Sequence, residues 1–309
     1  MSDMSAKISL VEKTLRSQRD TWGEISQRMA AISGREFPHE PAKRIIIAGV
    51  GSSFHAAKLA GFALIRDKTR VRIPIVACNS MSVGNEVVPT RGDWFFGITH
   101  RGRTPVTLQA MEFADQAGAF TLQVSGIDAP TAPSAKMVLS TVAQEPVEPH
   151  TASVTGAICA ISALLSGQKA VEEWDALRSI GDPDLETLRK RAGEGPTVLI
   201  GEWEGEWLAR EGALKLLEMA DLASRAYGSE EFFHGPRFAY SPDKDRVWHV
   251  SMPKDPRNSM IRASHSIGIY GATPLAWVPA LVELQWLSLA VALNRGIDPD
   301  RRSLASLEM

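Results

Sequence analysis

The chain has 309 residues, of which 44% are hydrophobic and 23% charged, as in ordinary globular proteins. Its 34 lysines and arginines are balanced by 36 acidic residues, so we expect no nucleic-acid partner and no polybasic membrane patch. No apolar run approaches the roughly 18 residues of a membrane helix, and the first residues lack the pattern of a signal peptide. The two cysteines provide neither a disulfide framework nor metal-ligand spacing, so we expect a cytoplasmic protein.

The first half of the chain alternates strand-like and helical patterns. Residues 5–33 repeat apolar residues at helical spacing. The β-branched run over 44–49 is typical of a strand buried on both faces. Further strand-like runs occur at 73–78, 94–98, 120–124 and 137–141, with helical stretches at 55–65 and 106–117. This alternation predicts a doubly wound α/β domain.

A second unit follows the charged segment 172–194. Residues 197–201 repeat the opening of a strand followed by glycine, and a helix is expected over 206–222. The same order of strand, glycine and helix in both halves predicts a degenerate internal duplication. A last long helix over about 277–295 is expected to stop at Gly296.

A glycine- and serine-rich loop follows the first strand, with the sequence Gly49-Val50-Gly51-Ser52-Ser53. Glycines allow a tight turn, and the amides and hydroxyls at a helix start can hold an anion. Phe54 stands where the dinucleotide fingerprint needs a third glycine, and no acidic residue ends the second strand, so no nicotinamide or other cofactor is expected. The alternative is a plain strand–helix turn in which Ser52 or Ser53 caps the helix.

A second polar loop, residues 99–104, follows the strand at 94–98. The carboxyl ends of parallel strands share one edge of a sheet, where ligands bind. Four hydroxyl groups are therefore expected to converge there, from Ser52, Ser53, Thr99 and Thr104. Arg101 or Arg103 adds positive charge to this loop, although a solvated loop remains the alternative interpretation.

Glu211, Lys215 and Glu218 fall on one face of the expected helix 206–222, because they are spaced by four and three residues. Such a Glu–Lys spacing is also compatible with an ordinary surface ion pair. His234 precedes Gly235-Pro236 and is expected in a loop. The other histidines show no metal-binding pattern, and we expect no metal site.

Together these motifs resemble the tandem sugar-isomerase (SIS) domain family, which includes the isomerase half of glucosamine-6-phosphate synthase. The family's motifs correspond here to Gly49–Ser53, to Thr99–Thr104, to Glu211–Glu218 with Leu217 in place of a lysine, to Glu231 with His234-Gly235-Pro236, and weakly to Thr151-Ala152-Ser153. The resemblance covers residues 10–309.

The resemblance implies two tandem three-layer α/β/α domains, each with a parallel five-stranded sheet flanked by helices. We place an N-terminal helical segment at 1–38, the first SIS domain at 39–170, and the second, with a C-terminal tail, at 195–309. A homodimer with sites at its interface is implied as well.

The implied ligand is a small sugar phosphate. By the motif match, the substrate and its phosphate are held by Gly51, Ser52, Ser53, Thr99, His100, Arg101, Thr104 and Ser153. Glu218 is implied to be the base that moves a proton between two carbons, with Lys215 supporting the developing charge. His234 is implied to assist ring opening, reaching in from the neighbouring subunit.

Three departures from the family qualify this picture. The chain contains no glutaminase domain, and Ser306 replaces the lysine with which the family forms a Schiff base, within Arg302–Ser306. Arg101 replaces a serine and either points inward to the anion or outward as a solvated cation. Stand-alone isomerases, deaminases and deglycases are therefore better models than the synthase.

The resulting hypothesis is an enzyme that isomerises an aldose or ketose phosphate, or deaminates or deglycates an amino-sugar phosphate, through an enediol or enolamine. The alternative is a non-catalytic module that senses a sugar phosphate.

Overall fold

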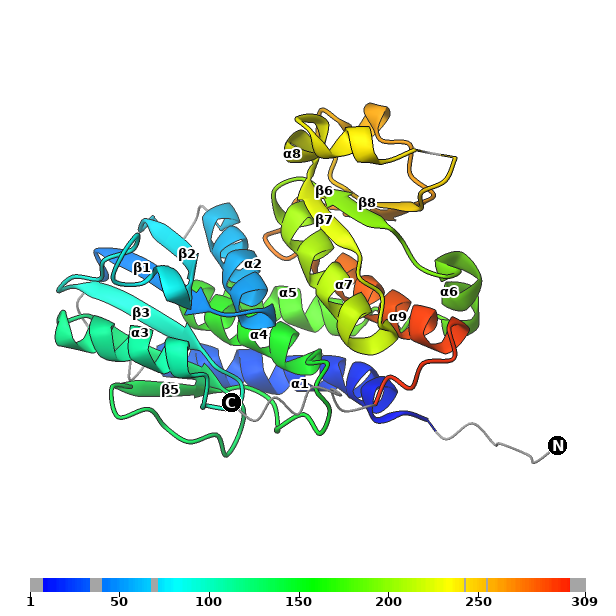
Figure 1. Cartoon of the computed structure of the whole chain (residues 1–309). Coiled ribbons are helices and arrows are strands. Elements are labelled where there is room, and N and C mark those ends of the chain that lie inside the picture. Colours follow the sequence, from blue (N-terminus) through cyan, green and yellow to red (C-terminus); the bar gives the residue numbers. More distant parts are fainter. Residues whose placement is uncertain (1–7, 34–40, 68–71, 242, 254, 301–309) are drawn as a thin grey trace.

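The computed structural model describes residues 8–33, 41–67, 72–241, 243–253 and 255–300. These residues form two parallel β-sheets that are flanked by helices (Figure 1). The first sheet has five strands in the order β2-β1-β3-β4-β5. The strands are β1 Arg44–Gly49, β2 Ile75–Asn79, β3 Asp93–Ile98, β4 Phe120–Ser125 and β5 Met137–Ser140. The expected doubly wound α/β arrangement is confirmed for this half.

The second sheet has four strands in the described residues, in the order β7-β6-β8-β9. They are β6 Val198–Gly201, β7 Arg225–Gly228, β8 Val247–Ser251 and β9 His265–Gly268. The expectation of five strands is therefore wrong for the described part of this sheet. Residues 269–277, between β9 and the next helix, form no strand of their own. They contain Gly271, with a φ of 114°, and Pro274, which has no amide hydrogen to donate.

Helices cover both faces of the first sheet. The helices of the chain are α1 Leu10–Ser33, α2 Ser52–Arg66, α3 Pro105–Gln116, α4 Ala152–Ser166, α5 Gln168–Arg178, α6 Leu185–Ala192, α7 Glu204–Ala220, α8 Ser229–Phe233 and α9 Val278–Asn294. Ile45 and Ile47 belong to the buried cluster with α1, α2 and α4, whereas Ile46 belongs to the cluster with α3 on the other face. A strand buried on both faces explains the unbroken apolar run of β1.

The charged segment 172–194 is helical rather than a simple linker, because it contains most of α5 and all of α6. The rings of Trp22 on α1 and Trp174 on α5 pack edge to face at 5.0 Å. The Nε1 of Trp22 also donates a hydrogen bond to Thr155 on α4. At the other end of the chain, α9 ends at Asn294, and Gly296 has a φ of 66°, so the expected glycine stop is confirmed.

The hydrophobic core runs without interruption from one sheet to the other. A single buried cluster includes Ile47 and Phe96 of the first sheet and Leu199 and Val250 of the second. Strands β1–β5 fall within residues 39–170 and β6–β9 within 195–309. The division of the chain into separate domains at those boundaries stays a prediction.

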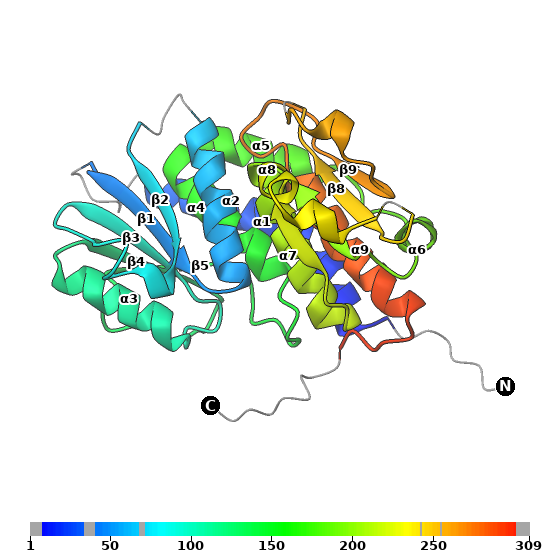
Figure 2. The ribbon, with the colours of Figure 1, turned by 45° about the horizontal axis from the view of Figure 1, so that its top comes forward.

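Helices α2 and α7 join the two sheets, lying side by side in both ribbon views (Figures 1 and 2). Arg66 at the end of α2 forms an ion pair with Glu204, a buried carboxylate in the first turn of α7. A buried carboxylate needs such a partner, because an unpaired charge in the interior is costly. The pairing therefore fixes the end of one helix against the start of the other.

The two strand–glycine–helix units share a close backbone approach. A Cβ at Gly49 would lie 2.5 Å from the backbone of Ser53, and one at Gly201 would lie 2.3 Å from the backbone of Gly205. Two residues after each of these glycines the chain takes a positive φ, 57° at Gly51 and 50° at Trp203. The repeated sequence pattern thus corresponds to a repeated backbone geometry, which strains Trp203 because its side chain disfavours this region.

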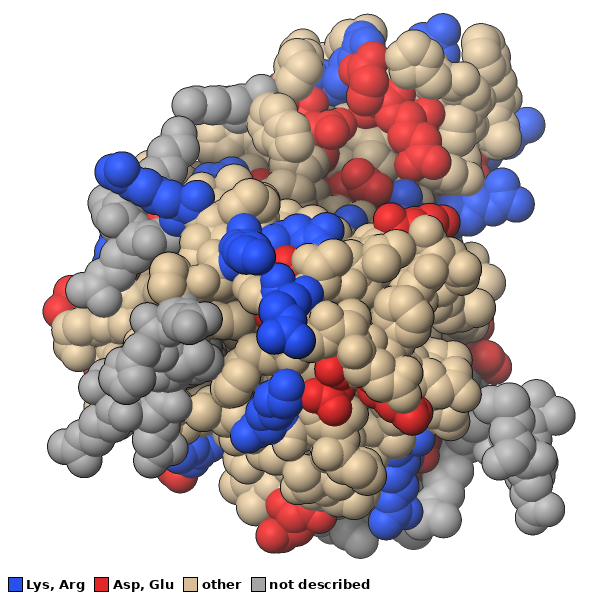
Figure 3. All heavy atoms as spheres, turned by 90° about the vertical axis from the view of Figure 1, so that its left-hand side faces the viewer, with Lys and Arg blue, Asp and Glu red and all other residues tan. Residues whose placement is uncertain are grey.

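Lysine and arginine side chains gather on the face where the strands of the first sheet begin (Figure 3). Lys43, Arg91 and Lys136 line an open hollow there. Lys43 donates to the carbonyl of Arg91, and Lys136 pairs with Asp115 at 3.0 Å. Lys43 and Lys136 therefore have partners close by, at the edge of the sheet opposite to the glycine- and serine-rich loop of residues 49–53 (the serine loop).

We expect Gly49→Ala to destabilise the protein by about 1–3 kcal/mol, because the new methyl group collides with the backbone of Ser53. Urea unfolding measures the effect. Gly181→Ala is the matched control, since a Cβ there meets no atom within 4 Å, and it should change stability by less than about 0.5 kcal/mol. Equal stability of the two variants would contradict the close approach.

Candidate active site

The topology of the first sheet creates a crevice between β1 and β3. These strands are neighbours, but the chain leaves β1 toward β2 and leaves β3 toward β4, on opposite sides. Ligands bind outside the carboxyl ends of the strands at such a switch point. Both polar loops singled out in the sequence begin there, the one after β1 at residues 50–53 and the one after β3 at residues 99–104.

The serine loop leads directly into α2. Gly51 precedes the helix with its φ of 57°, and the hydroxyls of Ser52 and Ser53 make no capping bond to the helix. Ser52 instead donates its Oγ hydrogen to Glu211 Oε1 on α7, at 3.0 Å. The structure therefore differs from the alternative of a simple N-cap, because one serine faces the second half of the chain.

The loop after β3 is closed by its own threonines. Thr99 Oγ1 donates to Thr104 Oγ1 at 3.1 Å and accepts a hydrogen bond from the Thr104 amide at 3.3 Å. Gly102 has a φ of 65°, and a Cβ there would lie 2.5 Å from the carbonyl oxygen of Pro130. Neither threonine lines the adjacent hollow, so these hydroxyls act on the loop rather than toward the hollow.

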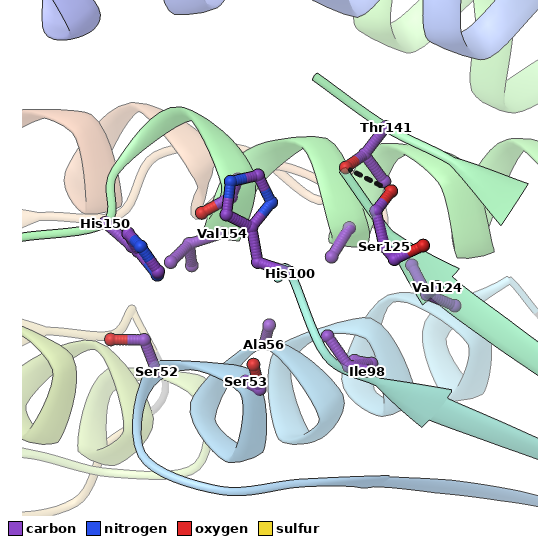
Figure 4. Close-up of a pocket in the computed structure, with 12 residues that line it drawn as sticks. Ser52, Ser53, Ala56, Ile98, His100, Val124, Ser125, Thr141, His150 and Val154 are labelled. Atoms are coloured by element: carbon purple, nitrogen blue, oxygen red, sulfur yellow. Dashed lines mark hydrogen bonds between the residues drawn. The ribbon is translucent and has the colours of Figure 1, made fainter. Parts of the chain in front are cut away.

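A small, partly open hollow lies between the serine loop and the start of α4 (Figure 4). It is lined by Ser52, Ser53, Ala56, Ile98, His100, Val124, Ser125, Thr141, His150, Ser153, Val154 and Ala157. Four of the predicted ligand-binding residues meet there: Ser52, Ser53, His100 and Ser153. Its walls carry hydroxyl groups and two imidazoles among apolar side chains, which suits a small polar ligand with an anionic end.

Arg101 does not line this hollow. Its guanidinium lies 3.3 Å from Glu148, and both side chains are about half exposed, at 45% and 52%. Arg101 therefore points outward, away from the hollow, which is one of the two orientations expected from the sequence.

Glu145 organises the segment that carries Ser153. Its buried carboxylate accepts hydrogen bonds from the amides of Thr151 and Ser153 and from the hydroxyl of Thr151. These amides belong to the first turn of α4, where a negative charge is favourable. The Ser153 amide is thereby committed to Glu145, so its hydroxyl is the group available to the hollow.

A cluster of two carboxylates, a lysine and a histidine adjoins the hollow through Ser52. Glu211 is fully buried and lies 2.7 Å from His55 Nδ1 and 3.5 Å from Lys215 Nζ. Lys215 is also fully buried and lies 2.5 Å from Glu218. The side chain of Glu218 is 29% exposed, so this carboxylate reaches the surface of the cluster.

The three charged groups Glu211, Lys215 and Glu218 shift one another's pKa values. Burial alone would raise the pKa of Glu211, but Lys215 and His55 hold it below its ordinary value. Burial works to lower the pKa of Lys215, yet Glu211 and Glu218 together hold it above its ordinary value. The pKa of Glu218 is raised, mainly by burial, with Lys215 acting in the opposite direction. Glu218 is thus the carboxylate of the two that binds a proton more readily.

His234 lies away from this cluster within the single chain. Its side chain is 75% exposed and contacts Glu230 at 3.1 Å, and it does not line the hollow. Ser306 and the rest of residues 301–309 lie outside the described residues. Within the described ranges, no group of three or more histidine, cysteine or acidic side chains is arranged to hold a metal ion. None of the described helices combines the length and apolar character needed to cross a bilayer.

Sequence reasoning missed several residues that the structure brings to this site. His150, Ser125 and Thr141 line the hollow, and His55 contacts Glu211. His150 directly precedes the Thr151-Ala152-Ser153 turn, so its position beside a recognised motif was the available signal. Ser125 and Thr141 follow or end strands of the same sheet edge, which the parallel order of strands could have indicated.

Comparison with known proteins finds relatives among the glutamine–fructose-6-phosphate aminotransferases. It is 25% identical over 311 residues to a glutamine–fructose-6-phosphate aminotransferase (isomerizing) of Pyrobaculum aerophilum, covering 85% of this chain and 51% of that protein. The resemblance to the SIS family is confirmed. No family model matches the chain, and the chain spans about half or less of the length of the curated relatives that it matches.

Solved structures share the SIS fold over nearly the whole chain. The C-terminal domain of a glucosamine-fructose-6-phosphate aminotransferase from Francisella tularensis superposes with a TM-score of 0.75 at 16% identity, covering 98% of this chain and 100% of that one. A glucosamine-6-phosphate deaminase from Thermotoga maritima gives a TM-score of 0.71 at 18% identity, covering 96% and 98%. At these identities the similarity establishes the fold.

Because Arg101 lies outside the hollow and pairs with Glu148, we expect Arg101→Ser to change the Kd for inorganic phosphate by less than about threefold, as for an exposed ion pair. Ser53→Ala, which alters the lining of the hollow, should weaken binding by about tenfold. Isothermal titration calorimetry measures both. A tenfold or larger loss with Arg101→Ser would instead indicate the inward orientation.

Proposed function

We propose that this protein is a phosphosugar-processing enzyme. It interconverts an aldose and a ketose phosphate, or deaminates or deglycates an amino-sugar phosphate, through an enediol or enolamine. The observation that carries the proposal is Ser52, which lines the hollow and also bonds to Glu211 in the carboxylate–lysine cluster. In this proposal a phosphate is held in the hollow and the sugar carbons extend past Ser52 toward Lys215 and Glu218.

The phosphate is held by neutral donors in this proposal. The hydroxyls of Ser53 and Ser153 are donors in the lining of the hollow, whereas Ser52 lines it with its hydroxyl hydrogen donated to Glu211. The first turn of α2 adds the favourable end of a helix dipole. Gly51, Thr99 and Thr104 contribute by shaping the two loops. Among the remaining candidates, His100 lines the hollow, whereas Arg101 acts from outside it.

Glu218 is the base. It takes the proton from the carbon next to the carbonyl group, and the electron pair of that C–H bond moves into an enediolate or enolamine. Return of the proton to the neighbouring carbon completes an isomerisation. In an amino-sugar phosphate the same proton return gives an imine, and water then hydrolyses this imine to a carbonyl group with release of the amine, which is deamination or deglycation. A carboxylate with a raised pKa suits this task, because general bases work best when their pKa approaches the operating pH.

Lys215 supports the negative charge that develops on the sugar oxygen. The two flanking carboxylates hold its pKa above the ordinary value, so it is cationic at neutral pH and has no free electron pair for a Schiff base. Together with Ser306 at the position of the family's lysine, this argues against glucosamine 6-phosphate synthesis from fructose 6-phosphate and glutamine. His234 of a second subunit would complete the site by assisting ring opening.

We expect Glu218→Gln to lower kcat by about 10²–10⁴, as for loss of a general base. The variant should keep a Kd for fructose 6-phosphate or glucosamine 6-phosphate within about threefold of the wild type, because shape and burial are preserved. Stopped assays with product analysis and calorimetry measure the two effects. Glu24→Gln, at a side chain that is 79% exposed, is the matched control and should leave both unchanged.

The pH profile gives the same experiment a second readout. Only deprotonated Glu218 accepts a proton, so kcat should rise with pH through its pKa, which lies above the ordinary 4.5. An unchanged kcat for Glu218→Gln would disprove its role as the base. Tight binding of both sugar phosphates without turnover by the wild type would favour a sensor.

The role of His234 across subunits is tested by a mixed dimer. If one subunit carries Glu218→Gln and the other His234→Ala, one of the two shared sites keeps both wild-type residues. Such a dimer, purified through two different tags, should have about half the wild-type kcat, because the two-fold arrangement pairs each base with the partner's histidine. Each homodimeric variant should be nearly inactive, and an inactive mixed dimer would contradict the shared site.

A further inference from the structure

His150 is a buried histidine that extends into the hollow. It lies in the segment before α4, and its ring points toward the side of the hollow where Ser52 lies (Figure 4). Within the described residues its buried Nε2 meets no hydrogen-bonding group. Burial of a polar atom without a partner is costly, so an atom that carries no partner here needs an explanation.

The neighbouring His100 is less able to contact a ligand, because its Nε2 already has a hydrogen-bond partner. Its Nε2 accepts a hydrogen bond from the Glu145 amide at 3.3 Å. Its buried Nδ1, like the Nε2 of His150, has no hydrogen-bond partner among the described residues, but it lies against Gly126, where a Cβ would be 3.0 Å away. In Figure 4 the nitrogens of His100 are turned away from Ser53. Protonation of Nε2 would break the bond to Glu145, so His100 is suited to remain neutral.

The two rings hold one another in place. They pack edge to face with centroids 4.9 Å apart and an angle of 74° between their planes. Because His100 is fixed by Glu145, and Glu145 also accepts hydrogen bonds from Thr151, the residue next to His150, the His150 ring is positioned from both sides. Its Nε2 is therefore pre-organised rather than free to seek another partner.

Charged groups face His150 from three elements. They are Glu145 and Glu148 on its own segment, His100 and Arg101 in the loop after β3, and Lys215 on α7. Burial lowers the pKa of His150 most, Lys215 and Arg101 lower it further, and the two glutamates oppose them. The pKa of His100 is lowered to about 4, again mainly by burial. Both imidazoles are thus neutral at neutral pH.

The lining of the hollow contains no lysine and no arginine. Arg101, which follows the lining residue His100 in the sequence, pairs with Glu148 outside the hollow. A doubly charged phosphate in the hollow therefore meets hydroxyls, amides and two imidazoles. Of these groups only an imidazole can gain a positive charge, and of the two imidazoles only that of His150 can do so without losing a hydrogen bond.

We propose that His150 is a ligand-binding residue whose Nε2 contacts an oxygen of a bound phosphate ester, and that the dianion draws a proton from solvent onto this imidazole. The proposal deepens the proposed function, since it rests on the hollow being the phosphate site. Its sign follows from electrostatics. A dianion nearby stabilises imidazolium, so the ligand and the proton bind together and the affinity rises as the pH falls.

Calorimetry with inorganic sulfate and with fructose 6-phosphate tests this proposal. Sulfate stays doubly charged between pH 6 and 8, so any proton uptake on binding belongs to the protein. The wild type should take up close to one proton per sulfate at pH 7 in buffers of different ionisation enthalpy, and its sulfate affinity should rise about tenfold from pH 7.5 to 6.0. His150→Gln should take up none and should show less than about a twofold change.

His265→Gln is the matched control, because His265 lies on β9 beside Glu283 and outside the hollow. It should behave as the wild type. A measurement without any variant covers the case that His150→Gln does not fold. Nitrogen NMR of histidine-labelled wild type should show one imidazole changing from a neutral to a doubly protonated spectrum when sulfate is added.

Equal proton uptake by the wild type and His150→Gln, absence of sulfate binding, or no imidazole becoming protonated would overturn the proposal. These outcomes are separable from failure of the proposed function. Proton uptake with sulfate but no turnover of any sugar phosphate would disprove the proposed enzymatic function and support the His150 site. Turnover without His150-dependent proton uptake would do the reverse.

Discussion

The buried carboxylate of Glu211 is the constraint on which the arrangement of the site depends. A charge without solvent must be paired, and its partners come from both halves of the chain: Ser52 and His55 from α2, and Lys215 from its own helix. These bonds require α2 and α7 to lie side by side. They thereby bring the serine loop of the first sheet to the face of α7 that carries Glu218.

The features that follow from local backbone chemistry could be predicted from the sequence. The apolar run of β1 and the glycine at the end of that strand specify a buried strand and a tight entry into α2, and the structure has both. The spacing of Glu211, Lys215 and Glu218 likewise predicts that they share one face of a helix. The sequence could not tell a surface ion pair from the buried cluster, because burial is decided by packing against another helix.

Features that depend on contacts between distant residues were not predictable. The orientation of Arg101, in the loop after β3, is set by Glu148. The position of the His150 ring is set by His100 of that same loop and by Glu145. The second sheet likewise has four strands in the described residues, and residues 269–277 add no further strand to it. In each case the decisive interaction joins segments whose pairing leaves no periodic pattern in the sequence.

The continuous core gives the chain a mechanical property that two separate cores would not have. Ile47 of the first sheet and Leu199 of the second belong to one buried cluster, and the long apolar helix α9 contributes most of its residues to the same cluster. Neither sheet can lose its packing without exposing apolar surface of the other. We therefore expect loss of packing in one half to destabilise the other, with α2 and α7, which both contribute residues to this cluster, coupling the two halves.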